Sequence, residues 1–188
     1  MSAAPGAGAG AGAGRVPGPV RVVVMGVSAV GKSTVGTLLA AHLGASFVDG
    51  DDLHPAANVA KMASGIPLTD EDRWPWLDAV AATLAAGAPM VVASSALRRV
   101  YRDRILAGAP GTVFVHLAAD PAILRARANA RTDHFMPPAL LDSQLATLEP
   151  LAPDEPGWTV DVSTATPASA AADAGQLVLG IDWAQVRH

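Results

Sequence analysis

Eight consecutive residues have the spacing of a phosphate-binding loop. Gly26-Val27-Ser28-Ala29-Val30-Gly31-Lys32-Ser33 matches the pattern G-x-x-x-x-G-K-[ST] at every fixed position. Glycine permits the tight turns in which successive backbone N–H groups point at phosphate oxygens. We expect Lys32 to reach the β- and γ-phosphates and the Ser33 hydroxyl to hold Mg²⁺. The predicted nucleotide-binding segment extends to Thr34.

A second group of candidate residues is acidic. Asp49-Gly50-Asp51-Asp52-Leu53-His54 follows a short apolar run. Beside nucleotide phosphates, one carboxylate helps to hold hydrated Mg²⁺ and another accepts the proton of an attacking hydroxyl. A solvated acidic turn is the alternative interpretation, and His54 is open to a purely structural role.

Arginines form the third group. Arg127 and Arg131 are four residues apart, so they share one face of a predicted helix, and a helix-breaking stretch follows them. We expect a mobile lid at about residues 127–138 that excludes water and stabilises the transferring phosphoryl group, whereas Arg125 lies on a solvated face. One or two further arginines are expected to bind a carboxylate or phosphate and the others to lie on the surface; these are Arg73, Arg98, Arg99 and Arg102.

These residues require elements that bring them to one place. Apolar runs predict strands at residues 20–25, 45–49, 89–94, 111–117 and 159–162. Helices are expected at 34–43, 55–64, 69–87, 97–106, 120–131, 137–148 and 167–179, with Thr69 as a cap. Strands that alternate with helices predict an α/β fold of three layers, with a central parallel sheet and helices on both faces. Ligands of such sheets bind at the carboxyl ends of the strands.

Composition limits the remaining possibilities. The chain of 188 residues suits one domain, and its formal net charge of −4 gives no reason to expect nucleic acid or an anionic membrane as a partner. There is no cysteine, and a cytoplasmic setting fits that absence. The Ala/Gly-rich residues 1–19 are expected to be a disordered arm, which leaves residues 20–188 as the folded domain.

Several longer segments resemble the gluconokinases, which are small P-loop kinases related in fold to shikimate and adenylate kinases. The resemblance covers about residues 20–161 and rests on three specific segments besides the phosphate loop. They are Asp49-Gly50-Asp51-Asp52-Leu53-His54-Pro55, Leu68-Thr69-Asp70-Glu71-Asp72-Arg73-Trp74-Pro75-Trp76-Leu77 and His134-Phe135-Met136-Pro137.

The resemblance implies ATP-dependent phosphorylation of D-gluconate to 6-phospho-D-gluconate, with ATP and Mg²⁺ bound at the phosphate loop. It implies that Ser33 ligates the metal, that Asp49 supports the metal through water, and that Asp51 orients the attacking hydroxyl and takes its proton. Arg127 and Arg131 are expected to close over the transferring phosphate. Substrate contacts are expected from Asp51, His54, Arg73 and Arg98.

Two alternatives stay open at this point. One is a kinase of the same fold that acts on another small hydroxylated acid such as shikimate, and the other is a catalytically weak nucleotide-binding protein. A GTPase switch is disfavoured because the chain has no Asn-Lys-x-Asp segment. The resemblance also makes a homodimer plausible.

The chain departs from the family pattern inside the phosphate loop itself. The family usually has small Gly and Ser residues where this chain has Ala29 and Val30. A β-branched residue such as Val30 makes a loop stiffer, so the nucleotide affinity is expected to be sensitive to this position. Arg98-Arg99 replaces the usual Lys-Arg pair, which keeps the charge and changes its geometry.

Overall fold

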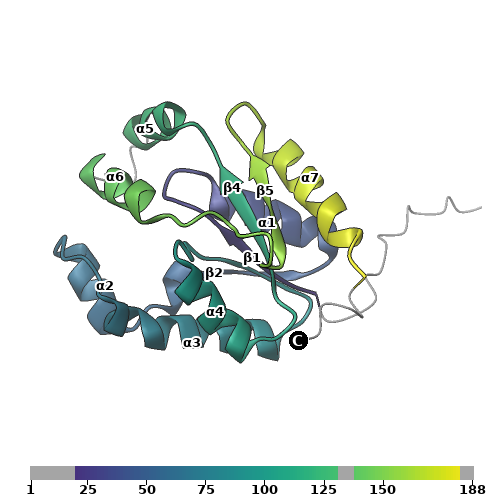
Figure 1. Cartoon of the computed structure of the whole chain (residues 1–188), viewed down its shortest axis with the longest axis horizontal. Coiled ribbons are helices and arrows are strands. Elements are labelled where there is room, and N and C mark those ends of the chain that lie inside the picture. The colour runs from purple at the N-terminus through teal and green to yellow at the C-terminus, as the bar shows by residue number, and fades with distance from the viewer. Residues whose placement is uncertain (1–19, 131–137, 183–188) are drawn as a thin grey trace, which may run out of the picture.

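The computed structural model describes residues 20–130 and 138–182, which form a parallel sheet between two layers of helices (Figure 1). The five strands lie in the order β2-β3-β1-β4-β5, and all neighbouring strands are parallel. The strands are β1 (Arg21–Met25), β2 (Ser46–Asp49), β3 (Met90–Ala93), β4 (Val113–Ala118) and β5 (Gly157–Asp161). The predicted α/β fold is therefore confirmed.

Each predicted helix is present within a few residues of its expected bounds. The helices are α1 (Lys32–Leu43), α2 (Ala56–Ala63), α3 (Asp70–Ala86), α4 (Arg99–Gly108), α5 (Pro121–Ala130), α6 (Pro138–Thr147) and α7 (Pro167–Leu179). Sequence patterns did not predict the short 3₁₀ helix η1 (Gly50–Leu53). No helix within the described ranges is long and apolar enough to cross a membrane.

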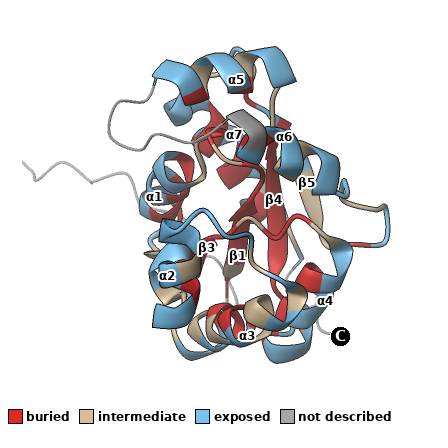
Figure 2. Cartoon of the chain, turned by 90° about the vertical axis from the view of Figure 1, so that its left-hand side faces the viewer, coloured by how far each residue is buried: buried red, intermediate tan, exposed pale blue. Residues whose placement is uncertain are grey.

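Alternate residues of the central strand β1 face different helical layers. Val22 and Val24 belong to the core shared with α1 and α7, whereas Val23 and Met25 belong to the core shared with α3 and α4. All four side chains are fully buried, and Figure 2 shows the buried residues concentrated along the sheet. Burial on both faces explains why the strand reads as a continuous apolar run.

The register brings the candidate residues to one edge of the sheet. Asp49 at the end of β2 lies opposite Ala93 at the end of β3, and Met25 at the end of β1 lies opposite His116 of β4. The phosphate loop, the acidic segment and residues 94–98 therefore all leave the sheet at its carboxyl edge, where ligands of such folds bind.

The start of α3 follows the sequence prediction. The Thr69 hydroxyl accepts a hydrogen bond from the Asp72 N–H, and the Asp72 carboxylate accepts one from the Thr69 N–H. This reciprocal cap fixes the first turn of the helix. The same carboxylate also binds the Lys61 amine at 2.6 Å, so the cap holds α2 against α3.

One expectation for Arg102 was a position on the surface, but the structure places its side chain in the interior. Its side chain is fully buried, and it forms an ion pair with the buried carboxylate of Glu155. The remaining guanidinium N–H groups donate to the carbonyl oxygens of Ala96, Leu97 and Glu149 at 3.1–3.3 Å. Arg102 therefore connects α4, the segment before α4 and the segment that follows α6.

Two parts of the sequence prediction lie outside the described residues. They are the Ala/Gly-rich segment 1–19 and most of the expected lid, residues 131–137.

Replacing Glu155 by Ala is expected to lower the free energy of unfolding by about 3–5 kcal/mol, because Arg102 then remains buried without its counter-charge. Asp154→Ala is the matched control. Asp154 precedes Glu155 in the chain, but its carboxylate pairs with Arg99 at the exposed surface, where an ion pair contributes little. Denaturant titration of both variants tests this expectation. Equal losses for the two variants would contradict it.

Candidate active site

The phosphate loop lies between β1 and α1 and contains three residues with positive φ. They are Gly26 at 139°, Ala29 at 64° and Gly31 at 100°. A Cβ atom on Gly26 would lie only 2.6 Å from the carbonyl oxygen of Leu117, so the chain permits no side chain there. The loop conformation thus depends on glycine at its first position.

Ala29 and Val30, where the chain departs from the pattern that the resemblance implies, are buried in the protein. Their exposed fractions are 7% and 3%, and both belong to the core shared with α1 and α7. These two side chains thus contribute apolar contacts beneath the loop.

The N-terminus of α1 has no side-chain cap. Its N-cap residue is Gly31, which has no side chain with which to cap the helix. Such a helix end is suited to an anion, because the N–H groups of the first turn point outward and the helix dipole favours negative charge there. Lys32, in the first turn, donates from Nζ to the carbonyl oxygen of Val27 at 3.1 Å.

The side chains of Ser33 and Asp49 are hydrogen-bonded next to the phosphate loop. The Ser33 hydroxyl donates to Asp49 Oδ2 at 2.5 Å, and Asp49 Oδ1 accepts the N–H of Asp51 at 3.1 Å. The Asp49 side chain is the cap of η1, so it fixes the position of Asp51 relative to the phosphate loop. Sequence reasoning named all three residues but did not predict this cap.

The Ser33–Asp49 pair fits Mg²⁺ rather than a metal held entirely by protein. Among the described residues, no three His, Asp or Glu side chains are grouped as metal ligands. Mg²⁺ prefers hard oxygen ligands and usually takes only one or two from protein when phosphates are present. A hydroxyl and a carboxylate beside an anion site meet that requirement.

His54 is held in place by two residues that sequence reasoning did not assign to the site. Its ring stacks on Trp76 with centroids 4.4 Å apart, and its Nδ1 lies 3.3 Å from the Asn58 amide. Burial lowers the pKa of His54, and the nearby Asp51 carboxylate opposes that shift only in part. His54 is therefore neutral at neutral pH and able to hydrogen-bond a hydroxyl. The Trp76 indole also donates to the Gly50 carbonyl at 2.6 Å.

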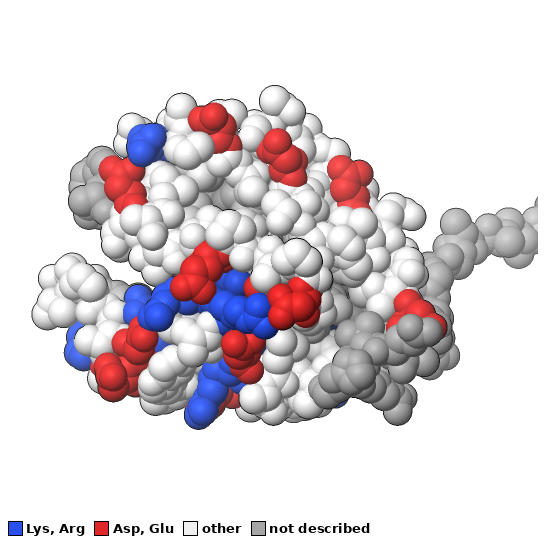
Figure 3. Space-filling view, in the orientation of Figure 1, with Lys and Arg blue, Asp and Glu red and all other residues white. Residues whose placement is uncertain are grey.

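Arg73 and Arg98 lie together around Tyr101. Their guanidinium carbons are 5.5 and 5.3 Å from the centre of the Tyr101 ring. Asp70 accepts hydrogen bonds from the Tyr101 hydroxyl at 2.6 Å and from Arg98 at 2.7 Å. These two bonds lower the pKa of Asp70, the Tyr101 bond most, so its carboxylate stays ionised. Figure 3 shows basic side chains gathered near α4 and bordered by acidic ones.

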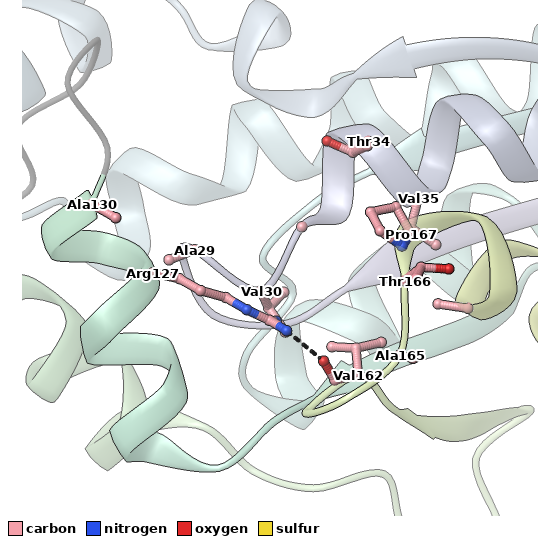
Figure 4. A pocket seen from close by; sticks show the side chains of 12 residues that line it. Ala29, Val30, Thr34, Val35, Arg127, Ala130, Val162, Ala165, Thr166 and Pro167 are labelled. Atoms are coloured by element: carbon pink, nitrogen blue, oxygen red, sulfur yellow. Dashed lines mark hydrogen bonds between the residues drawn. The ribbon is translucent and has the colours of Figure 1, made fainter.

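A cavity of about 370 Å³ opens on the other side of the phosphate loop (Figure 4). Its walls are mainly small and apolar residues from the phosphate loop, α1, α5, the segment between β5 and α7, and the start of α7. The lining residues are Ala29, Val30, Gly31, Thr34, Val35, Arg127, Ala130, Val162, Ala165, Thr166, Pro167 and Ala170. Sequence reasoning did not include the segment 162–167, although Thr166-Pro167 is a typical helix start.

Arg127 lies in this cavity rather than beside Asp51. Its guanidinium donates to the carbonyl oxygen of Val162 at 2.7 Å, as Figure 4 shows. The expected closure of Arg127 over the phosphates is therefore not seen in this conformation and stays a prediction. Arg131 lies outside the described residues. Arg125 pairs with Asp142 at the exposed surface.

A parallel sheet in this order, with a phosphate loop after its first strand, defines a P-loop nucleotide-binding protein. The family described as AAA domain matches residues 22–151. A shikimate kinase structure from Acinetobacter baumannii covers 86% of the chain, and the chain covers 93% of it, at a TM-score of 0.55 and 17% identity. At that identity, the likeness concerns the fold alone.

Relatives of higher sequence identity show which family of P-loop proteins the chain belongs to. A gluconokinase from Gluconobacter oxydans is 49% identical over 139 residues, which are 72% of this chain and 78% of the relative. The crystal structure of a gluconokinase from Sinorhizobium meliloti is 44% identical, with a TM-score of 0.75 over 90% of this chain and 94% of that one. The chain belongs to the gluconokinase family, as its sequence segments predicted.

Proposed function

We propose that the protein transfers the terminal phosphoryl group of ATP to D-gluconate and forms 6-phospho-D-gluconate. The observation that carries this proposal is the arrangement at the carboxyl edge of the sheet. There the phosphate loop lies beside Asp51, and Asp51 is held by the same Asp49 carboxylate that accepts the Ser33 hydroxyl. Membership of the gluconokinase family supports D-gluconate as the acceptor.

The surroundings of the phosphate loop suit both the base and the phosphates of ATP. The apolar cavity next to Arg127 suits a nucleotide base, because a flat apolar ring stacks well on a guanidinium plane. The amides at the start of α1 and the Lys32 amine suit the phosphates. Ser33 and Asp49 would hold Mg²⁺, which neutralises charge on the phosphates during transfer.

Asp51 is the proposed base. Its side chain is exposed at the edge of the sheet, and its backbone is fixed by the bond to Asp49. The terminal hydroxyl of gluconate attacks the γ-phosphorus while its proton passes to the Asp51 carboxylate. The bond from the γ-phosphorus to the bridging oxygen breaks, and ADP leaves with that oxygen. Arg127 and Arg131 stay candidates for stabilising the transferring group.

Arg98 and Arg73 are the proposed partners of the gluconate carboxylate. Both lie against the ring of Tyr101, and a guanidinium binds a carboxylate through two parallel hydrogen bonds. Asp70 holds Arg98 at 2.7 Å and so orients it before the acceptor arrives. His54, neutral and fixed by Trp76 and Asn58, is placed to contact a hydroxyl of the acceptor.

The proposal also includes a cytoplasmic setting and a homodimer without a nucleic-acid or membrane partner. The absence of cysteine, the net charge of −4 and the family resemblance support these parts. Light scattering measures the oligomeric state directly.

Purified protein with MgATP is expected to produce ADP when gluconate is added and to give only background turnover with shikimate. A coupled ADP assay over a panel of sugar acids and shikimate measures this difference. Turnover with shikimate but none with gluconate would assign a different acceptor. ATP binding without turnover on any acceptor would support a nucleotide-binding protein without transferase activity.

Asp51→Asn is expected to reduce kcat by about 10²- to 10⁴-fold, because the amide cannot take the hydroxyl proton. Asp52→Asn makes the same change at the next exposed position and is expected to leave kcat within about twofold, since no step in the proposed transfer uses its carboxylate. Steady-state kinetics of both variants provide the comparison. A kcat for Asp51→Asn close to that of the unmodified protein would remove the base assignment.

Arg98→Gln is expected to raise the KM for gluconate by about tenfold or more, because a charge-assisted bond to the carboxylate is lost. The KM for ATP should change little. Arg99→Gln is the control, since the Arg99 side chain pairs with Asp154. If both variants raise the KM for gluconate equally, Arg98 does not bind the carboxylate.

A further inference from the structure

One peptide group of the phosphate loop is held from both of its sides. The carbonyl oxygen of Val27 accepts a hydrogen bond from Lys32 Nζ at 3.1 Å. The N–H of the same peptide group, which belongs to Ser28, donates to Gln144 Oε1 at 2.7 Å. Because a trans peptide is planar, its oxygen and its N–H point in opposite directions. Lys32 and Gln144 therefore lie on opposite sides of one rigid unit.

The lysine shows which part of the nucleotide this peptide group faces. In a phosphate loop of this pattern the lysine reaches the β- and γ-phosphates. The Val27–Ser28 peptide, which holds the Lys32 amine at 3.1 Å here, must therefore lie near the terminal phosphates. The base cavity involves other residues of the loop, from Ala29 to Gly31. Gln144 thus contacts the phosphate loop at the end away from the base.

Gln144 lies close in the chain to a residue that contacts Arg98 and Arg99. It lies in the last turn of α6, where its carbonyl oxygen accepts the N–H of Leu148. One residue further on, Glu149 accepts the Arg99 N–H at 2.6 Å and lies 3.7 Å from Arg98 Nε. A short stretch of chain thus connects the phosphate loop with the proposed carboxylate-binding arginine.

We propose that Gln144 is a positioning residue for the terminal phosphoryl group of the nucleotide. It acts through the Val27–Ser28 peptide, whose orientation determines how the loop and Lys32 meet that phosphate. The inference rests on the proposed function, namely that the donor is a nucleoside triphosphate whose base occupies the cavity beside Arg127. Gln144 therefore contributes more to the affinity for ATP than to the affinity for ADP and does not contribute to binding of the base.

Two variants separate the contributions of shape and charge. Gln144→Met has a similar length but cannot accept the Ser28 N–H, so the affinity for ATP is expected to fall by about tenfold. Gln144→Glu keeps an acceptor but places a negative charge near the terminal phosphate, and a loss of more than about tenfold is expected. In both variants the affinity for ADP should stay within about twofold, because ADP lacks the terminal phosphate.

Calorimetry with Mg²⁺, ADP and a non-hydrolysable ATP analogue measures both affinities. Gln176 lies exposed on α7, and Gln176→Met and Gln176→Glu are the matched controls, expected to change neither affinity. Thermal unfolding of each variant identifies a general loss of structure. If one Gln144 variant fails to fold, the other still gives the ratio of the two affinities.

An unchanged ratio of ATP to ADP affinity would overturn the proposal, whether both affinities fall together or neither changes. No acceptor is present in these titrations, so they remain informative if the protein does not phosphorylate gluconate. A missing gluconate activity with a changed ratio would refute the proposed acceptor and support the role of Gln144.

Discussion

The buried ion pair between Arg102 and Glu155 determines how several parts of the site lie relative to one another. Both side chains are almost fully buried, and such a pair is tolerated only where further hydrogen bonds satisfy the remaining donors. Here those bonds go to the backbone before α4 and after α6. The direction of α4, which begins directly after Arg98, and the end of α6, which carries Gln144, therefore depend on one guanidinium.

The architecture was largely predictable because its causes are local in the sequence. The strands are buried on both faces, so they read as apolar runs, and the caps of α3 and α7 have their typical Thr residues. The 3₁₀ helix η1 was missed because it depends on the side chain of Asp49 accepting the Asp51 N–H. A bond of that kind has no periodic signal in the sequence.

The arginines show where sequence reasoning stops. Arg98, Arg99 and Arg102 are close in the chain and identical in type, yet Arg98 pairs with Asp70, Arg99 pairs with Asp154 at the surface and Arg102 is buried with Glu155. Their different surroundings come from residues about 28 to 55 positions away, a separation that follows from the hydrogen bonds and that no short motif records. Arg127 likewise was assigned by its spacing to Arg131, whereas its contacts are with the segment after β5.

Ala29 has a consequence for the thermodynamics of binding. A residue with a Cβ atom at a φ of 64° costs about 1–2 kcal/mol in the folded chain relative to glycine. In exchange, alanine has fewer conformations than glycine in the unfolded chain and while the loop is empty. With Val30 buried next to it, the loop is already ordered when the nucleotide arrives. Folding, and not the nucleotide, then carries the entropy cost of shaping the loop, so the protein exchanges some stability for a preorganised anion site.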